Sequence, residues 1–338
     1  MRRYKLLVLL VFLGAGSFLQ AQDSTKLKGF DYTKLKPIVH FFGNAEFNPS
    51  ADVSKDYSFW IGRTLFGFQY QYDKHWSGKV LIDRTKLTGS INTMYVKTAN
   101  LRWTPNDRFA MEGGVVSQNN YVPFETYWGY RFVAETFQDR YFAIPSTDIG
   151  LIAYYQISKK LALDVAVTNG EGPRIDQDSL GRIKLAGGIN FYPVRQIQAR
   201  AFYHLKSMGT PGHPQVEQLF NAFLIYRPGN KIRFGAEFIY VKNYSGVEGT
   251  DTYGGTLFGC ITLYKTLNYV LRYDRLIINH NQGTIVAPSF FSQNALISGV
   301  SVSPVRGITL CVNYQGSYRI NSIGSAGHRV LFTFEYKI

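Results

Sequence analysis

Arginine and lysine side chains recur at alternate positions of apolar stretches throughout the chain. In residues 197–206, Arg200 and Lys206 share one parity, and the other parity is apolar or aromatic at every position. Cationic groups repeated in this way along a water-filled passage attract anions and release them again. We expect these basic residues to line such a passage: Arg63, Arg102, Arg108, Lys184, Arg200, Lys206, Arg233, Arg272, Arg319 and Arg329.

Carboxylates fall on the same predicted face, but they are fewer. Glu112, Asp164, Glu237, Asp274 and Glu335 share the parity of the basic residues near them. An excess of positive charge in a passage favours anions. The alternative is that the two charge signs pair across the wall, where each exposed pair contributes little free energy. The pattern favours a net preference for anions, with pairing as the open alternative.

Residues 118–147, "QNNYVPFETYWGYRFVAETFQDRYFAIPST", form the longest predicted loop. A loop of this length in a compact fold is usually functional or disordered, and its aromatic content argues against disorder. We expect it to fold into the passage and narrow it; an exterior lid or two extended strands are the alternatives. The predicted constriction residues are Tyr121, Phe124, Glu125, Tyr127, Trp128, Arg131, Glu135, Asp139 and Arg140.

The elements that position these side chains are predicted to be short amphipathic strands. In a strand, successive side chains point to opposite faces, so alternation of apolar and polar residues indicates one apolar face and one face in contact with water. Breaker clusters such as "PGN" (228–230) and "PVRG" (304–307) separate the strands. Longer loops are predicted at the other strand ends, near 48–57, 84–90, 118–147, 169–182, 207–217, 243–252, 278–293 and 320–327.

The strand count predicts an all-β fold, a transmembrane antiparallel up-and-down β-barrel of about 16 strands over residues 37–338. The chain ends on the alternating stretch "HRVLFTFEYKI" (328–338), which we expect to pair with residues 37–47 and close the barrel. Tyr and Trp favour membrane interfaces, and aromatic residues fall at the short-turn ends of strands: Trp103, Tyr155, Phe191, Tyr226, Tyr264 and Tyr336. A soluble β-sandwich is the alternative, but no linker divides the chain.

The N-terminus predicts export. Basic residues, the apolar run "LLVLLVFL" (6–13) and small residues before Ala21 are typical of a signal peptide, here 1–21. The apolar run is shorter than the roughly 20 residues that a membrane-spanning helix needs. Residues 22–36 are then a periplasmic N-terminal segment. We expect the mature chain in the outer membrane of a Gram-negative cell.

Composition excludes several other classes of function. The net charge is +14, but the charges are dispersed singly, so we expect no nucleic-acid partner. The chain has two cysteines, Cys260 and Cys311, which allow at most one disulfide. No nucleophile elbow, HExxH motif or phosphate loop occurs, and the six histidines lack metal-ligand spacing. We therefore expect no enzyme, catalytic residue, metal or cofactor, although a membrane hydrolase recognised by geometry stays open.

Residues 131–172 resemble the Bacteroidota members of the phosphate-selective porin O and P family. The likeness lies in "DIG" (148–150), in the "TNGEG" (168–172) that follows it, and in "YVLRYD" (269–274). The resemblance implies a sixteen-stranded pore and passive diffusion of small solutes, with phosphate as one candidate. The family's ladder of arginine and lysine residues has no contiguous counterpart here, so phosphate selectivity is not carried over.

Together these patterns predict an outer-membrane pore for small hydrophilic solutes that prefers anions. The alternatives are a barrel plugged by its third loop, with a structural or adhesive role, and an outer-membrane hydrolase. The expected partners are outer-membrane lipid, small solutes or anions, and a second and third copy in a homotrimer. The last strand resembles the signal read by the barrel assembly machinery, with Ile338 in place of the usual Phe.

Overall fold

The computed structural model describes residues 31–49, 57–86, 92–142, 144–177, 179–210, 212–279, 292–320 and 326–338. The chain divides into two units, Met1–Lys36 and Pro37–Ile338. In the first unit, the short helix η1 (Tyr32–Lys34) follows Asp31, whose side chain accepts a hydrogen bond of 3.0 Å from the Thr33 N–H. The predicted signal peptide, 1–21, lies outside the described residues.

The second unit is built from strands rich in aromatic and β-branched residues, which suit a pleated surface. Two short helices, α2 (Val122–Trp128) and α3 (Phe137–Phe142), lie in the connection between the fifth and sixth strands, and η2 (Tyr244–Gly246) lies in a later loop. The strands are β1 (Leu35–Phe47), β2 (Tyr57–Gln71), β3 (Trp76–Lys86), β4 (Asn92–Asn106), β5 (Phe109–Ser117), β6 (Thr147–Ser158), β7 (Leu161–Thr168), β8 (Lys184–Phe191), β9 (Ile197–Thr210), β10 (His213–Tyr226), β11 (Ile232–Lys242), β12 (Asp251–Tyr264), β13 (Leu267–Asn279), β14 (Gln293–Val305), β15 (Ile308–Arg319) and β16 (Ala326–Lys337).

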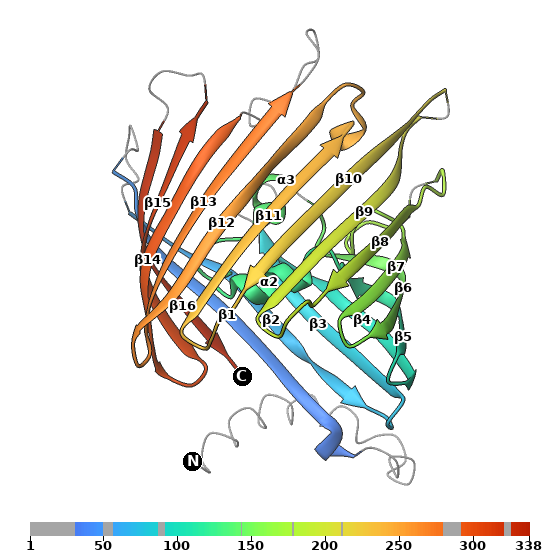
Figure 1. Cartoon of the computed structure of the whole chain (residues 1–338), viewed down its shortest axis with the longest axis horizontal. Coiled ribbons are helices and arrows are strands. Elements are labelled where there is room, and N and C mark those ends of the chain that lie inside the picture. The colour runs from blue at the N-terminus through green and yellow to red at the C-terminus, as the bar shows by residue number, and fades with distance from the viewer. Residues whose placement is uncertain are drawn as a thin grey trace. The chain divides into compact units, whose positions relative to one another are not determined.

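The sixteen strands form one closed antiparallel barrel in which sequence neighbours are also neighbours in the sheet (Figure 1). The ring closes where β1 pairs with β16, with His40 opposite Lys337 and Phe47 opposite Val330. The Ile338 N–H donates a further hydrogen bond to the Val39 carbonyl, at 3.0 Å. The predicted barrel and its closing pair are confirmed. Closure leaves no sheet edge with unpaired backbone groups.

The outer surface of the barrel is apolar. Large apolar side chains at alternate positions are exposed there, for example Val165 and Leu257, each 60% exposed. The predicted girdle residues Tyr155, Phe191 and Tyr226 are exposed near the short turns, as are Tyr264 and Tyr336. Trp103 instead stacks on Trp76, with 6.0 Å between ring centroids.

The predicted alternation of short turns and long loops holds with one correction. The turn between β4 and β5 is residues 107–108, and that between β14 and β15 is residues 306–307. The predicted loop at 207–217 is mostly strand, because β9 and β10 continue their hydrogen-bonded pairing as far as Thr210 and His213. Its sequence contains the glycine and proline residues typical of a loop, yet the backbone pairing of the hairpin continues through it. The predicted loops at 48–57, 84–90, 278–293 and 320–327 lie partly outside the described residues.

Two further features of the fold bear on the sequence analysis. Cys260 on β12 and Cys311 on β15 are both buried and both free thiols. Among the described residues, no helix is long and apolar enough to cross a membrane.

Candidate functional site

The connection between β5 and β6, here called the inserted loop (residues 118–146), lies inside the barrel, and α2 and α3 are seen among the strands in Figure 1. Pro123 lies in the first turn of α2, and Gly129, at φ 67°, ends the helix in the left-handed conformation that glycine adopts without strain. The helix turns Phe124 and Trp128 toward the inner face of β10–β12. Both side chains are almost fully buried.

The contact between α2 and the wall is an aromatic cluster. The Phe124 ring lies 5.7 Å from that of Phe223 on β10, and the Trp128 ring lies 5.2 Å from that of Phe258 on β12. Gly235 on β11 makes room for this arrangement, since a Cβ there would stand 2.2 Å from the Phe258 ring. The wall of the barrel is therefore shaped to receive the helix.

Polar side chains of the wall satisfy backbone groups of the inserted loop, which would otherwise be buried without partners. Arg233 donates to the Trp128 carbonyl at 3.0 Å, and Arg272 donates to the Glu135 carbonyl at 2.5 Å. Gln315 on β15 donates to the Val133 carbonyl at 2.8 Å. Two of the arginines predicted to line a passage thus hold the loop in place.

The second helix of the inserted loop, α3, packs on the inner wall of the barrel. Phe137, Tyr141 and Phe142 belong to a buried apolar cluster with Phe202, Leu219, Ile239, Val241 and Leu276. Gln138 donates to Glu237 on β11 at 2.5 Å, and the Tyr141 hydroxyl donates to Asp274 on β13 at 3.2 Å. Apolar packing and polar pairing therefore both fix α3.

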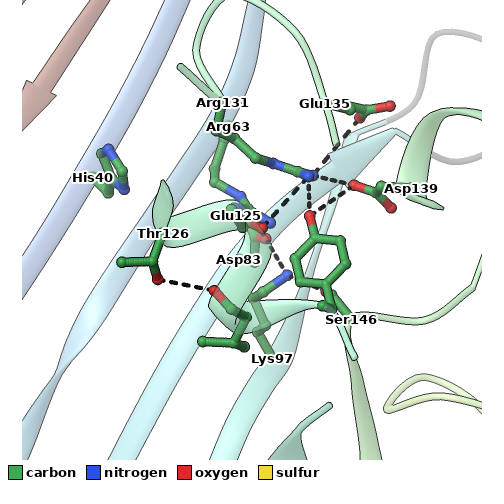
Figure 2. A network of polar contacts seen from close by, with 12 residues as sticks. His40, Arg63, Asp83, Lys97, Glu125, Thr126, Arg131, Glu135, Asp139 and Ser146 are labelled. Carbon is green, nitrogen blue, oxygen red and sulfur yellow. Dashed lines mark hydrogen bonds and ion pairs between the residues drawn. The ribbon is translucent and has the colours of Figure 1, made fainter. Parts of the chain in front are cut away.

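On the opposite side of the lumen, an ion-pair network joins the loop to β2, β3 and β4 (Figure 2). Arg131 of the loop contacts the Tyr121 hydroxyl and the Asp139 carboxylate, and lies 3.7 Å from Glu125. Arg63 of β2 lies 3.7 Å from the other oxygen of Glu125, so one carboxylate bridges loop and wall. The loop thereby contacts both sides of the barrel.

The wall end of this network is held by Asp83 on β3. Its carboxylate accepts from Arg63 at 3.1 Å and lies 3.4 Å from the Lys97 ammonium, which also donates to Ser146 at 3.0 Å. At the loop end, burial and then the neighbouring Glu125 raise the pKa of Tyr121 well above its usual value. Tyr121 therefore stays neutral, and its hydroxyl donates a hydrogen bond of 3.2 Å to the Asp139 carboxylate.

The basic residues predicted to line a passage differ in their surroundings. Several are neutralised by a carboxylate on the wall: Arg200 contacts Asp164 at 2.6 Å, and Lys184 contacts Asp148 at 3.0 Å. Arg63, Arg102 and Arg272 pair in the same way with Asp83, Glu112 and Asp274. The pairing that the sequence left as an alternative thus describes these five residues.

The remaining basic residues lie elsewhere. Lys206, on the same face of β9 as Arg200, lies opposite Glu217 of β10, while Arg319 is exposed at the loop end of β15. Arg329 on β16 faces Glu46 of β1 at 3.7 Å. Arg108 is a correction: it lies in the exposed two-residue turn between β4 and β5 and is not on the inner wall. Its parity matched the pattern, but the strand ends before it.

The predicted constriction residues all lie in the inserted loop, but they have different surroundings. Glu125, Arg131, Glu135 and Asp139 meet in the ion-pair network, together with Tyr121. Phe124 and Trp128 are buried in the contact with the wall. Tyr127 lies with its ring 6.0 Å from the Arg227 guanidinium, and Arg140 lies with its guanidinium 5.5 Å from the Tyr141 ring.

Two cavities flank the inserted loop: one extends from the β10–β11 turn to β16, and the other lies against β1, β2, β15 and β16. The turn-side cavity, of about 370 Å³, is bounded by Arg227, Lys231, Arg233, Lys337 and Glu335 among others. The arginine cavity, of about 260 Å³, is bounded by Arg63, Arg131, Arg140, Arg329 and Glu135 among others.

Phe132 lines both cavities and so forms part of the partition between them. Its ring is 6.3 Å from that of Phe42 on β1 and 5.8 Å from that of Tyr130. Sequence analysis missed Phe132, Phe42 and the turn residues Arg227 and Lys231. The inward parity of Phe42 was a usable signal for one of them, because it breaks an otherwise polar face.

The "DIG" and "TNGEG" segments meet around a buried carboxylate. Asp148 accepts hydrogen bonds from the Thr168 hydroxyl at 2.7 Å and from the Gly170 and Gly172 N–H groups at 2.8 and 3.1 Å. Both glycines have positive φ, 86° and 85°, which points their N–H groups at the carboxylate. The motif thus fixes the start of the β7–β8 loop.

A closed sixteen-strand barrel with an apolar exterior, a charged interior and a loop folded into its lumen defines the class of outer-membrane porins. The model of one family matches residues 140–326, and its description is "Putative beta-barrel porin-2, OmpL-like". The match covers more than half of the chain, and the chain belongs to this family of β-barrel porins. Porins are channels and not enzymes. No curated protein sequence matches the chain.

Solved structures share the fold at low sequence identity. The outer membrane channel DcaP of Acinetobacter baumannii superposes with a TM-score of 0.68 at 14% identity, covering 90% of this chain and 97% of that one. The anion-selective porin from Comamonas acidovorans gives 0.67 at 8% identity, covering 90% and 99%. OmpT, an outer membrane protein of Vibrio cholerae, gives 0.64 at 10% identity, covering 90% and 97%. These similarities establish a shared fold.

Proposed function

We propose that the barrel is a passive pore for small hydrophilic solutes and that it prefers anions. The observation that carries this proposal is the charge of the two cavities beside the inserted loop. Each cavity is lined by four basic side chains and one carboxylate. In the arginine cavity, Arg63 and Arg131 are paired with Asp83 and Asp139 outside the lining, so the excess charge lies on Arg140 and Arg329. Excess positive charge on the wall of a water-filled passage raises the local concentration of anions.

The paired arginines of the wall add little to this field. Arg200 and Asp164, or Arg272 and Asp274, cancel each other's charge at a distance. The unbalanced charge instead lies in the turn-side cavity, where Arg227 and Lys231 are exposed. Selectivity therefore resides in residues of the short turns and of the inserted loop more than in a continuous row along the strands.

Further parts of the proposal concern how the protein reaches and occupies the membrane. Residues 1–21 direct export, the last strand is recognised by the barrel assembly machinery, and three copies associate. The resemblance to the Bacteroidota phosphate-selective porins adds phosphate to the candidate solutes. Support for the assembly step is the continuous pairing of β16 with β1 up to its last residues.

Conductance of the purified protein in a planar bilayer tests the preference for anions. Under a KCl gradient of about tenfold, we expect the reversal potential to shift from zero toward the equilibrium potential of chloride. The double variant Arg227→Gln, Lys231→Gln removes two exposed charges and should lower the chloride-to-potassium permeability ratio by about twofold or more. Arg108→Gln, an equally exposed turn residue outside the cavities, is the matched control. Equal permeabilities in the wild type would contradict the proposal.

A barrel plugged by its own loop is the second candidate. The observation that favours it is the position of Phe132, which together with Phe42 and Tyr130 separates the arginine cavity from the turn-side cavity. A protein that folds and inserts, yet gives no conductance steps, would support a structural or adhesive role.

A further inference from the structure

The arginine cavity contains two guanidinium groups with weak partners. Arg63 and Arg131 are held by Asp83 and by Asp139. Among the described residues, Arg329 has Gln315 at 3.3 Å and Glu46 at 3.7 Å, and Arg140 has no carboxylate within 4.0 Å. Guanidinium groups that share a cavity repel each other unless an anion lies between them.

Among the described residues, the cavity's own carboxylate, Glu135, makes no ion pair within 4.0 Å with Arg140 or Arg329. Glu135 lies 3.8 Å from Arg131, which is already surrounded by Glu125 and Asp139. Arg140 comes from α3 and Arg329 from β16, so the two groups approach the cavity from the loop and from the wall. The planar fork of each guanidinium matches the two oxygens of a carboxylate.

Apart from Asn44 and Gln315, the rest of the lining is apolar. Phe42, Phe132 and Leu331 are each less than 5% exposed, and Val133 and Trp60 complete this surface. Gly62 keeps the space open, because a Cβ there would stand 3.2 Å from the Asn44 amide nitrogen and 3.3 Å from the Trp60 ring. An organic anion would cover the apolar surface that remains open in the cavity, whereas an inorganic anion would leave it uncovered.

We propose that the arginine cavity is a binding site for a small organic carboxylate with an apolar body. Arg140 and Arg329 hold the carboxylate, and the apolar body rests on Phe42 and Phe132. This inference rests on the proposed pore function and names the class of solute that the pore prefers. It also gives Phe132 two roles, as the floor of the site and as the barrier beyond it.

Benzoate and acetate are the probes, because they share the charged group and differ in the apolar body. Binding of each is measured by calorimetry on the full-length protein in detergent, and block of the chloride current is measured in bilayers. We expect benzoate to bind at least about tenfold more tightly than acetate. Arg140→Gln combined with Arg329→Gln should weaken benzoate about tenfold or more. Arg319→Gln, at the exposed loop end of β15, is the control.

A second variant separates the contribution of Phe132 from that of Arg140 and Arg329. Phe132→Leu keeps an apolar side chain of smaller area, so it should lower the ratio of benzoate to acetate affinity and leave acetate unchanged. Retention of the heat-sensitive gel mobility of a folded barrel shows that each variant is folded. Equal affinity of the wild type for benzoate and acetate would overturn the inference, as would benzoate binding that survives the double arginine variant.

The outcomes also separate this inference from the proposed function. Chloride selectivity without preferential benzoate binding leaves the pore standing and removes the site. Benzoate binding in detergent by a protein that conducts no ions supports the site and overturns the pore.

Discussion

The two sides of the lumen are built differently. On the β10–β14 side, Phe223, Phe258 and Val270 form an apolar cluster with the inserted loop, and Arg233 and Arg272 bind its carbonyls. On the β15–β16–β1–β2 side, the inner wall borders the arginine cavity, with Arg63 and Arg329 in its lining. The first side anchors the loop by apolar packing, whereas the second leaves space for a solute and contacts the loop through the Arg63–Glu125 ion pair. A pore of this kind is asymmetric because a loop must be fixed on one wall to narrow the gap to the opposite wall.

The anchoring side should be the more sensitive to truncation of a single side chain. Trp128 is fully buried and donates its ring N–H to the Ala134 carbonyl at 2.8 Å. Replacing it by alanine leaves a cavity in the aromatic cluster and should cost about 3–5 kcal/mol of unfolding free energy. Urea unfolding in detergent measures this change. Tyr127→Ala, one residue earlier and only half-buried, is the control; an equal loss in both variants would show that Trp128 is no anchor.

A buried ion pair of the wall should respond almost as strongly. Arg200 donates to both oxygens of Asp164, at 2.6 and 2.9 Å, and both side chains are almost fully buried. Gly188 leaves the space that the guanidinium fills. Arg200→Gln leaves the buried Asp164 carboxylate without its cationic partner and should destabilise the barrel by about 3 kcal/mol. Adding Asp164→Asn should restore part of that loss, and unfolding curves without any such recovery would contradict the coupling.

The open side should show its largest effect in conductance. Phe132 separates the two cavities, so Phe132→Ala joins them and should raise the single-channel conductance by about twofold or more. The Trp128→Ala variant provides the comparison, because it disturbs the anchor and not the partition. A conductance that stays at the wild-type level in Phe132→Ala would show that solutes take another route past the loop.

Much of this architecture was predictable because its signals are local. Alternation with period two sets the strands, and the aromatic composition of residues 118–147 distinguishes an ordered loop from a disordered one. The anchoring wall also has a local signal that was overlooked: apart from Asn221, residues 219–226, "LFNAFLIY", are apolar or aromatic on both parities, which indicates a buried inner face.

The partners of the loop were beyond sequence reasoning. Tyr130 meets Ser301 across 171 residues of sequence, and Arg233 and Arg272 bind loop carbonyls that no side-chain pattern reveals. Alternation placed Arg272 on the inner face correctly. It did not distinguish an arginine that faces water from one that holds the backbone of another segment, since both have the same parity.

The smallest effect is expected where an ion pair of the wall is open to water. Arg102 contacts Glu112, but its side chain is 39% exposed, against 1% for Arg200. Water screens the charge that remains after Arg102→Gln, so the loss of stability should stay below about 1 kcal/mol. Raising the salt concentration should shrink it further, whereas the effect of Arg200→Gln should hardly change. Unfolding curves of both variants at low and high salt measure this contrast, and equal salt dependence would contradict the distinction between buried and open pairs on the wall.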